Sequence, residues 1–252
     1  MSNMFDLTGK VALVTGGTVG LGAGMALALA KAGADLVLVT YTDNDDTMMN
    51  ECQKLGRRCH VITADLSKEE ELPGVAEKAI AVFGHIDILV NNAGIIRRVP
   101  IADHPAKDWH DVINLNLNSV FFLTQLIGRH MLERKSGKII NIASMLSYEG
   151  GILVPGYTAS KHAVAGLTKA FANEWAGSGV NVNAIAPGYM ETRNTAPIRQ
   201  DADRTESITA RIPAGRWGQP EDLGGPAVFL ASTASDYLHG HILNVDGGWQ
   251  AR

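Results

Sequence analysis

Short apolar runs rich in β-branched residues recur along the chain, separated by longer segments whose apolar residues repeat at helical spacing. A short run that is apolar on both faces predicts a strand in a sheet covered by helices on both sides. Segments such as Ala23–Lys31 predict those helices, and glycines such as Gly33, Gly84, Gly137 and Gly179 stand just before the next strand. The predicted strands are Val11–Thr15, Leu36–Thr40, His60–Thr63, Ile86–Asn91, Lys138–Ala143, Val180–Ala186 and Ile242–Val245.

This alternation predicts an α/β fold: a doubly wound Rossmann-type domain with a seven-stranded, mostly parallel sheet and helices on both faces. The sequence of 252 residues shows no internal repeat and no Pro/Ser-rich linker, so we expect a single domain over residues 1–252. Residues 191–216 are polar and irregular, and they are too long for an ordinary connection. We expect them to form a mobile substrate lid.

Composition narrows the function classes. The formal net charge of −4 provides no basic surface for nucleic acid or anionic membrane, and no apolar run approaches the length of a membrane span. Residues 1–10 contain Asp6 and no apolar leader core, so we expect a cytoplasmic protein. Cys52 and Cys59 predict buried or half-buried free thiols, while His239 and His241, which alternate on a predicted strand, lack a third ligand and predict no metal site.

A glycine-rich turn, Thr15–Gly22, lies between the first predicted strand and the first predicted helix. Glycines there permit a tight turn in which the backbone approaches a pyrophosphate at the helix N-terminus. The glycine pattern alone also suits ordinary left-handed turns. Its position after the first strand of an α/β chain favours dinucleotide binding.

Four polar residues downstream of this turn suggest catalysis. Tyr157 and Lys161 are four residues apart, so they share a helical face, and the ammonium would lower the pKa of the phenol. Ser144 follows the fifth predicted strand, where it could hydrogen-bond a reacting oxygen or merely cap the strand end. Asn116 lies in the helical run Asp111–Phe122 and could be an ordinary polar helix residue. All four in this order, behind the glycine turn, favour a catalytic role.

With these motifs the chain resembles the short-chain dehydrogenase/reductase family from about Leu7 to Gly248, including the segments Asn91–Gly94 and Pro187–Gly188. The resemblance implies an NAD(P)-dependent alcohol dehydrogenase or ketoreductase in which Tyr157 is the acid/base, Lys161 lowers its pKa and holds the nicotinamide ribose, Ser144 orients the substrate oxygen and Asn116 anchors a water. It also implies packing of the Tyr157 helix between subunits of a homotetramer. The cofactor-binding residues it implies are Gly16, Thr18, Gly20, Leu21, Gly22, Thr40, Tyr41, Asp65, Leu66, Asn92, Ala93, Gly94, Tyr157, Lys161, Pro187, Gly188, Met190 and Thr192.

Further segments resemble the sugar-acid branch of the family: 91–98, 139–145, 184–190, 212–218 and 245–249. This implies reversible oxidation of a secondary alcohol on a hexonate-type acid, 2-dehydro-3-deoxy-D-gluconate or 2-deoxy-D-gluconate. A carboxylate needs a cation, so we expect Arg97, Arg98 and Arg193, together with Met145, to contact the substrate. The alternatives are oxidation of gluconate, reduction of a 3-oxoacyl group, or dinucleotide sensing without catalysis.

The end of the second predicted strand bears on the cofactor. Many NAD-using members of the family have an aspartate there, whereas this chain has Thr40 followed by Tyr41. Neither this position nor the glycine turn has a basic residue that would favour NADP, and Asp43, Asp45 and Asp46 close by would repel a 2′-phosphate. We therefore expect NAD as the preferred cofactor.

Overall fold

A computed structural model describes residues 3–42 and 46–252 of the chain. Its centre is one seven-stranded sheet in the order β3-β2-β1-β4-β5-β6-β7, and every neighbouring pair of strands is parallel. The predicted doubly wound α/β fold is confirmed, with a sheet that is parallel throughout. The strands are β1 (Val11–Thr15), β2 (Asp35–Thr40), β3 (Cys59–Thr63), β4 (Ile88–Asn91), β5 (Gly137–Ile142), β6 (Val180–Pro187) and β7 (Ile242–Val245).

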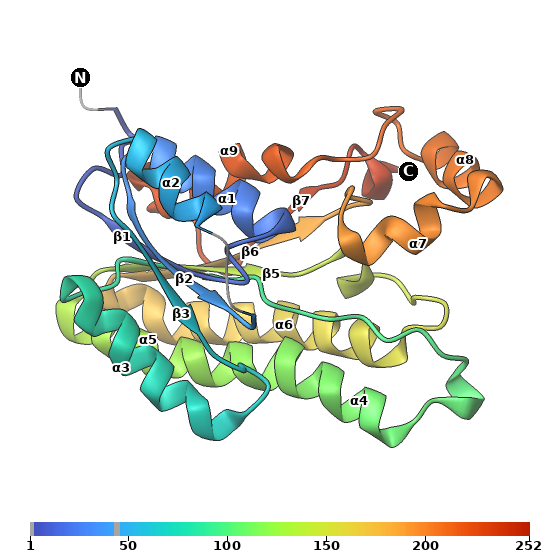
Figure 1. The fold of residues 1–252 in the computed structure, drawn as a ribbon, viewed down its shortest axis with the longest axis horizontal. Helices are drawn as coiled ribbons and strands as arrows, with labels where there is room; N and C mark the ends of the chain where they lie inside the picture. The colour runs from blue at the N-terminus through green and yellow to red at the C-terminus, as the bar shows by residue number, and fades with distance from the viewer. Residues whose placement is uncertain (1–2, 43–45) are drawn as a thin grey trace.

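Helices cover both faces of this sheet, with α1, α2 and α9 on one face and α3, α5 and α6 on the other (Figure 1). The two short helices α7 and α8 lie beyond the carboxyl ends of the strands, on the right of the view. The helices are α1 (Gly20–Lys31), α2 (Thr47–Lys54), α3 (Leu72–Phe83), α4 (Ala106–Ile113), α5 (Ser119–Arg134), α6 (Pro155–Trp175), α7 (Ala196–Arg199), α8 (Ala202–Arg211) and α9 (Gly224–Ala231).

Burial differs between the central strands and the edge strands. Every residue of β1 and β6 is buried, as expected of strands that pack against helices on both faces. The edge strands do not fit our expectation of two apolar faces, because His60 and Thr63 of β3 and Asn244 of β7 are exposed. An edge strand has a neighbour on one side only, so part of its surface meets solvent.

The strand order reverses at β1, which pairs with β2 on one side and β4 on the other. The chain leaves β1 through α1 on one face, and it later leaves β4 toward α4 and α5 on the opposite face. Connections that diverge in this way open a crevice at the carboxyl ends of the two strands, where ligands of such sheets bind. The fold therefore directs attention to the ends of β1 and β4.

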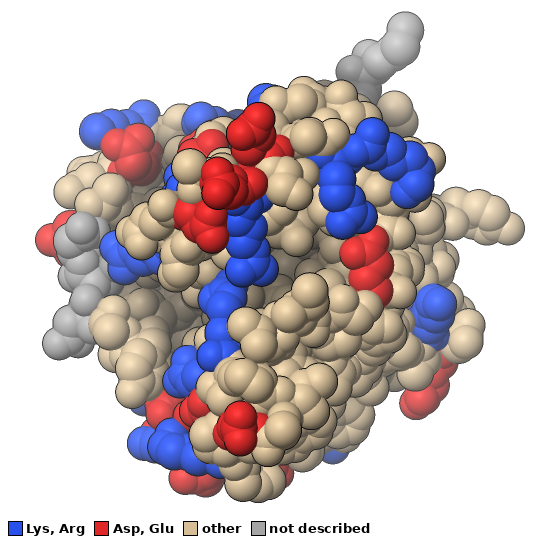
Figure 2. Space-filling view, turned by 90° about the vertical axis from the view of Figure 1, so that its right-hand side faces the viewer, with Lys and Arg blue, Asp and Glu red and all other residues tan. Residues whose placement is uncertain are grey.

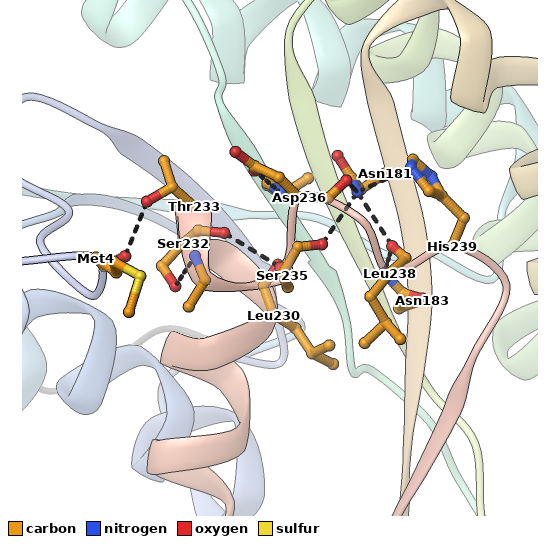
Figure 3. A network of polar contacts seen from close by, with 12 residues as sticks. Met4, Asn181, Asn183, Leu230, Ser232, Thr233, Ser235, Asp236, Leu238 and His239 are labelled. Atoms are coloured by element: carbon orange, nitrogen blue, oxygen red, sulfur yellow. Dashed lines mark hydrogen bonds and ion pairs between the residues drawn. The ribbon is translucent and has the colours of Figure 1, made fainter.

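Two asparagines of β6 hold the segment that leads into β7 (Figure 3). Asn181 Nδ2 donates hydrogen bonds to the carbonyl oxygens of Asp236 and Leu238, each at 3.0 Å, and lies 3.3 Å from His239 Nε2. Asn183 Nδ2 donates to the same Leu238 oxygen at 2.8 Å and Asn183 Oδ1 accepts from His241 N at 3.0 Å. The two histidines precede β7, so our placement of them on a strand is wrong.

A buried carboxylate ties together the amino ends of the central strands. Asp87 precedes β4, and its oxygens accept from Val11 N at 3.0 Å and from Arg134 Nη2 on α5 at 2.7 Å. His85 lies 3.2 Å and Lys10 3.9 Å from the same carboxylate. Burial alone would raise the pKa of Asp87, yet the hydrogen bonds and nearby cations leave it below its ordinary value.

Two smaller expectations are also resolved. Cys52 on α2 is buried and Cys59 on β3 is half-buried, and both are free thiols as predicted. Among the helices of the described residues, none combines the length and apolarity that crossing a membrane requires.

Candidate active site

The glycine turn leads from β1 directly into α1. Gly16 and Gly20 have φ angles of +61° and +56°, which favour glycine, and α1 begins at Gly20. The side chain of Asn92, just after β4, braces the turn by donating to the carbonyl oxygens of Thr15 at 2.9 Å and Gly16 at 3.2 Å. In return, Thr15 Oγ1 accepts from the backbone N–H groups of Asn92 and Ala93. The ends of β1 and β4 are thus locked together.

The turn also has no room for side chains at two of its glycines. A Cβ atom added to Gly22 would lie 2.0 Å from the Gly16 carbonyl oxygen, and one added to Gly17 would lie 2.7 Å from a methyl group of Leu38. The backbone therefore packs more closely than any other residue type allows. Together with the amino end of α1, this is a cradle that fits a pyrophosphate, because backbone N–H groups and the helix dipole favour an anion there.

Thr40 ends β2 beside this cradle. Its hydroxyl lies 3.3 Å from that of Thr18 in the turn, and the next residue, Tyr41, is 73% exposed. The sequence holds no Lys or Arg between Lys31 and Lys54. Of the three nearby aspartates that we expected to repel a 2′-phosphate, Asp46 precedes α2, and Asp43 and Asp45 lie outside the described residues.

Asp65 and Leu66 follow β3, the edge strand that pairs with β2. Asp65 Oδ1 accepts from Ser67 N at 3.0 Å and from Ser67 Oγ at 2.6 Å, so the carboxylate fixes its own loop. Leu66 is buried against the face covered by α3, and Leu21 of α1 packs at the margin of the core on the other face. Each lies on a loop or helix start at the carboxyl edge of the sheet.

Asn116 is fully buried, in a π-helical turn, Asn114–Asn118, that separates α4 from α5. The continuous helix that we expected over Asp111–Phe122 is interrupted there. The amide of Asn116 accepts from Ile95 N and donates to Ile95 O, both at 2.9 Å, and Nδ2 lies 3.4 Å from Ser160 Oγ on α6. Short π-helical turns often mark functional positions. Here the Asn116 side chain links the loop after β4 to α6.

Ser144 follows β5 and begins a single 3₁₀ turn, Met145–Ser147. Its Oγ accepts from Leu146 N at 3.1 Å, so it caps this turn as well as facing the phenol of Tyr157. Ser147 secures the arrangement from behind, since its hydroxyl donates to the Lys161 carbonyl oxygen at 2.8 Å. Two hydroxyls, from Ser144 and Tyr157, are therefore adjacent and could hold one oxygen of a ligand.

Tyr157 and Lys161 lie on one face of α6, as their spacing predicts. The Lys161 ammonium lies 5.5 Å from the centroid of the Tyr157 ring and donates to the carbonyl oxygen of Ile142 at 2.6 Å. Burial raises the pKa of Tyr157, against the hydrogen bond with Ser144 and the charge of Arg98, which lower it. Burial also lowers the pKa of Lys161 to about 8. The direction is the reverse of the one we expected for the phenol, because burial of the phenol outweighs the Ser144 hydrogen bond and the charge of Arg98.

The segment after β6 contains the residues that the family resemblance assigns to the nicotinamide end of the cofactor. Pro187 ends the strand, Gly188 N donates to Val245 O of β7 at 3.0 Å, and Met190 is buried and bridges to Gly218. Thr192 precedes a 3₁₀ turn and its N–H donates to Thr195 Oγ1 at 3.0 Å. The residues implied for the nicotinamide end are thereby placed beside one another at the end of β6.

A cavity of about 280 Å³ lies between the ends of β4, β5 and β6 and the helices α7 and α8. Ser144, Met145, Tyr157 and Gly188 line it, and so does Arg98, whose Nη2 donates to Asn194 O at 3.0 Å. Figure 2 views this face and shows Lys and Arg side chains following one another along the hollow at its centre. Arg98, Met145, Ser144 and Tyr157 are therefore brought together as predicted.

Two of the expected substrate residues do not line this cavity. The Arg97 guanidinium instead faces Asp108, at 3.6 Å, and Asp111, at 3.7 Å. Arg193 begins a 3₁₀ turn and is also not among the lining residues.

Sequence reasoning missed other lining residues, above all Arg204 and Arg211. We had interpreted 191–216 as irregular, whereas it contains α7 and α8. The signal that could have revealed α8 is Asp201, whose carboxylate caps the helix by accepting from Arg204 N at 3.0 Å.

Comparison with known proteins agrees with this geometry. A family model described as short chain dehydrogenase matches residues 10–203. The chain is 59% identical to 2-dehydro-3-deoxy-D-gluconate 5-dehydrogenase of Bacillus subtilis over 100% of this chain and 99% of that protein, and 56% identical to the protein of that name in Escherichia coli K12 over 98% of each. It also superposes, with a TM-score of 0.93 and 49% identity over 100% of both chains, on an Agrobacterium tumefaciens structure with bound NADP, provisionally named a 2-deoxy-D-gluconate 3-dehydrogenase.

Proposed function

This chain belongs to the short-chain dehydrogenase family, and we propose that it reversibly oxidises a secondary alcohol of a hexonate-type sugar acid, with 2-dehydro-3-deoxy-D-gluconate or 2-deoxy-D-gluconate as the favoured alcohol. Family membership makes it an NAD(P)-dependent oxidoreductase acting on CH–OH groups. The observation that carries the proposal is the cavity in which the adjacent hydroxyls of Ser144 and Tyr157 face the cation of Arg98. The names of full-length relatives at 59% and 56% identity support the choice of a sugar acid.

Each catalytic side chain has a role that its contacts support. Tyr157 takes the hydroxyl proton of the substrate during oxidation and returns it during reduction. Ser144 donates a hydrogen bond to the same oxygen and so orients the carbon that reacts. Lys161, whose buried ammonium lies 5.5 Å from the centroid of the Tyr157 ring, places a positive charge beside the phenol and, as the family resemblance implies, would hold the nicotinamide ribose. Asn116, held by both backbone groups of Ile95, keeps the β4 loop at a fixed distance from α6.

The dinucleotide fits the cradle described above. We propose that Gly16, Gly20 and Gly22 leave space for its pyrophosphate, and that Asn92 lies at its adenosine ribose. Thr192 and the Pro187–Gly188 segment would flank its nicotinamide half. When bound, the nicotinamide supplies the acceptor or donor of hydride. The protein's part is to hold the reacting carbon against it and to exclude water with residues 191–216, which we propose as the lid.

We further propose a preference for NAD. The Thr18 and Thr40 hydroxyls and the exposed Tyr41 border the adenosine end, and the sequence from Ala32 to Gln53 has no cation to pair with a 2′-phosphate. The A. tumefaciens relative was crystallised with NADP, and kcat/KM measured with each cofactor tests the preference.

We also propose that the protein is cytoplasmic and forms a homotetramer. Two free thiols suit a reducing compartment, which supports a cytoplasmic protein. A homotetramer is implied by the family resemblance, and the exposed aromatic rings of Trp109 on α4 and Tyr237 near β7 suit subunit interfaces. Light scattering on the purified protein would measure the assembly.

The test is a panel of hexonates and their keto forms, assayed with NAD and with NADP at the nicotinamide absorbance. We expect turnover with 2-dehydro-3-deoxy-D-gluconate or 2-deoxy-D-gluconate. A higher kcat/KM with D-gluconate would favour the gluconate alternative, and activity confined to 3-oxoacyl thioesters would refute the sugar-acid proposal. Dinucleotide binding with no turnover on any alcohol or ketone would favour a sensor.

A further inference from the structure

We propose that Arg204 and Arg211 on α8 bind the carboxylate of the substrate, so that selection of an acid over a neutral sugar is made by the lid helix. This inference rests on the proposed function, because it names the residues that recognise one end of the proposed substrate. It assigns to α8 a task that we had given to the Arg97–Arg98 segment.

The two arginines share one side of α8. They are seven residues apart, which is two helical turns, and both line the cavity that contains Tyr157. Ile208 lies between them and is buried in a small apolar cluster with Ile198 and Trp249. The apolar contact fixes which side of α8 faces inward, and the guanidiniums at either end of that side are therefore carried to the cavity.

Neither guanidinium has an anionic partner within residues 3–42 and 46–252. Other arginines of this region are in ion pairs: Arg199 lies 3.2 Å from Glu191, and Arg216 lies 2.7 Å from Asp222. The acidic residue that lines the same cavity, Glu149, is already engaged, because Oε1 accepts from Trp249 Nε1 at 3.0 Å and from Gln250 Nε2 at 2.5 Å. The positive charges of Arg204 and Arg211 are therefore available to bind an anionic ligand in the cavity.

The cations also lie near one another. Burial and the charge of Arg204 both lower the pKa of Arg98, so these two guanidiniums face the same partly desolvated space. Like charges held together in such a place are stabilised by an anion between them. A carboxylate fits the planar fork of a guanidinium with two hydrogen bonds, which a neutral hydroxymethyl group cannot reproduce.

Arg211 is held ready for this contact. Its guanidinium stacks over the Trp249 ring at 4.0 Å from the centroid, and Glu149 Oε1 holds the indole by accepting from its N–H at 3.0 Å. Stacking restrains the side chain before a ligand arrives, which reduces the entropy lost on binding. Arg98, Arg204, Arg211 and Tyr157 line one cavity; the charge of Arg204 acts on Arg98, and the charge of Arg98 acts on Tyr157. A substrate with its alcohol at Tyr157 would present its acid end to this helix.

The test compares a hexonate with its own primary amide, which keeps the shape and removes the charge. Arg204→Ala and Arg211→Ala should each raise KM for the acid about tenfold or more and leave kcat/KM for the amide nearly unchanged. Arg204→Lys and Arg211→Lys should restore part of the preference, since they keep the charge without the fork. Arg199→Ala is the matched control: it removes a nearby guanidinium that lies outside the cavity, and the acid-to-amide ratio should stay that of wild type.

An unchanged acid-to-amide ratio in both alanine variants, with NADH binding intact, would overturn the inference and leave the proposed function standing. If the wild type oxidises no hexonate, the proposed function fails, and the inference is then decided by calorimetry of D-gluconate binding to the NADH-loaded protein. Affinity lost in Arg204→Ala and Arg211→Ala but kept in Arg199→Ala would support the carboxylate site. Equal affinity in all of the variants would refute it.

Discussion

Replacement of Gly22 by alanine tests whether the glycine turn is a cradle for the dinucleotide. The new Cβ would lie 2.0 Å from the Gly16 carbonyl oxygen and 2.5 Å from the Asn92 amide nitrogen, where ordinary contact begins near 3.4 Å. Because the nearest atom belongs to the backbone, the start of α1 must move away from β1 by more than an ångström. That displaces the N–H groups that would face the pyrophosphate.

The expected loss of folding stability follows from overpacking at this site. Overfilling a tight site costs about 1–3 kcal/mol, and the higher helix propensity of alanine offsets at most about 0.5–1 kcal/mol of it. For a chain of 252 residues, each kcal/mol shifts the unfolding midpoint by about 2–4 °C. We expect Gly22→Ala to lower the thermal midpoint by several degrees and to weaken NADH binding, measured by fluorescence titration, about tenfold or more.

Gly74→Ala in α3 is the matched control. A Cβ added to Gly74 meets nothing within 4 Å, and the residue is helical, so the same substitution should stabilise the protein by about 0.4–1 kcal/mol without changing NADH affinity. If Gly22→Ala binds NADH and melts like wild type, the turn can accommodate a Cβ atom at this position, and the cradle argument fails.

Four further predictions concern catalysis, cofactor choice and stability. Tyr157→Phe should lower kcat about 10²–10⁴-fold and spare NADH binding; near-normal turnover would remove the phenol from the mechanism. Wild type should show the higher kcat/KM with NAD, and Tyr41→Arg should shift the ratio toward NADP; a tenfold wild-type preference for NADP, about 1.4 kcal/mol, would contradict us. Arg98→Ala should move the pH–rate profile for oxidation to higher pH, because the charge of Arg98 lowers the pKa of Tyr157, whereas Arg97→Ala should not. Asp87→Asn should destabilise the fold by about 3 kcal/mol at pH 7. The pKa of Asp87 is lowered on folding, so its contribution is present above the ordinary value of 3.8 and is lost as pH falls through the lowered value. Denaturant unfolding at pH 7 and pH 3 should therefore show a smaller stability difference between the two proteins at the lower pH.

Features set by short stretches of sequence were predictable. The bounds of β1 and β7 match the predicted strands Val11–Thr15 and Ile242–Val245, because apolar runs bounded by turns specify strands locally. Tyr157 and Lys161 share a helical face for the same reason. The order of the elements then fixes which strand ends meet, so the sequence also indicated the end of the sheet at which the site lies.

Features that depend on contacts across the fold were not predictable. The helical pattern of Asp111–Phe122 did not reveal the π-helical turn at Asn116, whose side chain contacts Ile95 in the β4 loop and Ser160 on α6. The helices within 191–216 were missed because few apolar residues mark them. Ile198 and Ile208 are buried in a cluster that includes Trp217 and Trp249, which come later in the chain.

The arginines of the site show which substrate contacts the sequence could predict and which it could not. Arg97 and Arg98 are neighbours in the chain and looked equivalent, but Arg97 faces Asp108 and Asp111 while Arg98 lines the cavity. Arg204 and Arg211 are distant from that segment and become its neighbours only after α8 folds over the sheet edge. Since the two arginines proposed to select an acid lie on α8 and the phenol lies on α6, a change that loosens α8 should weaken acid selectivity before it affects proton transfer at Tyr157.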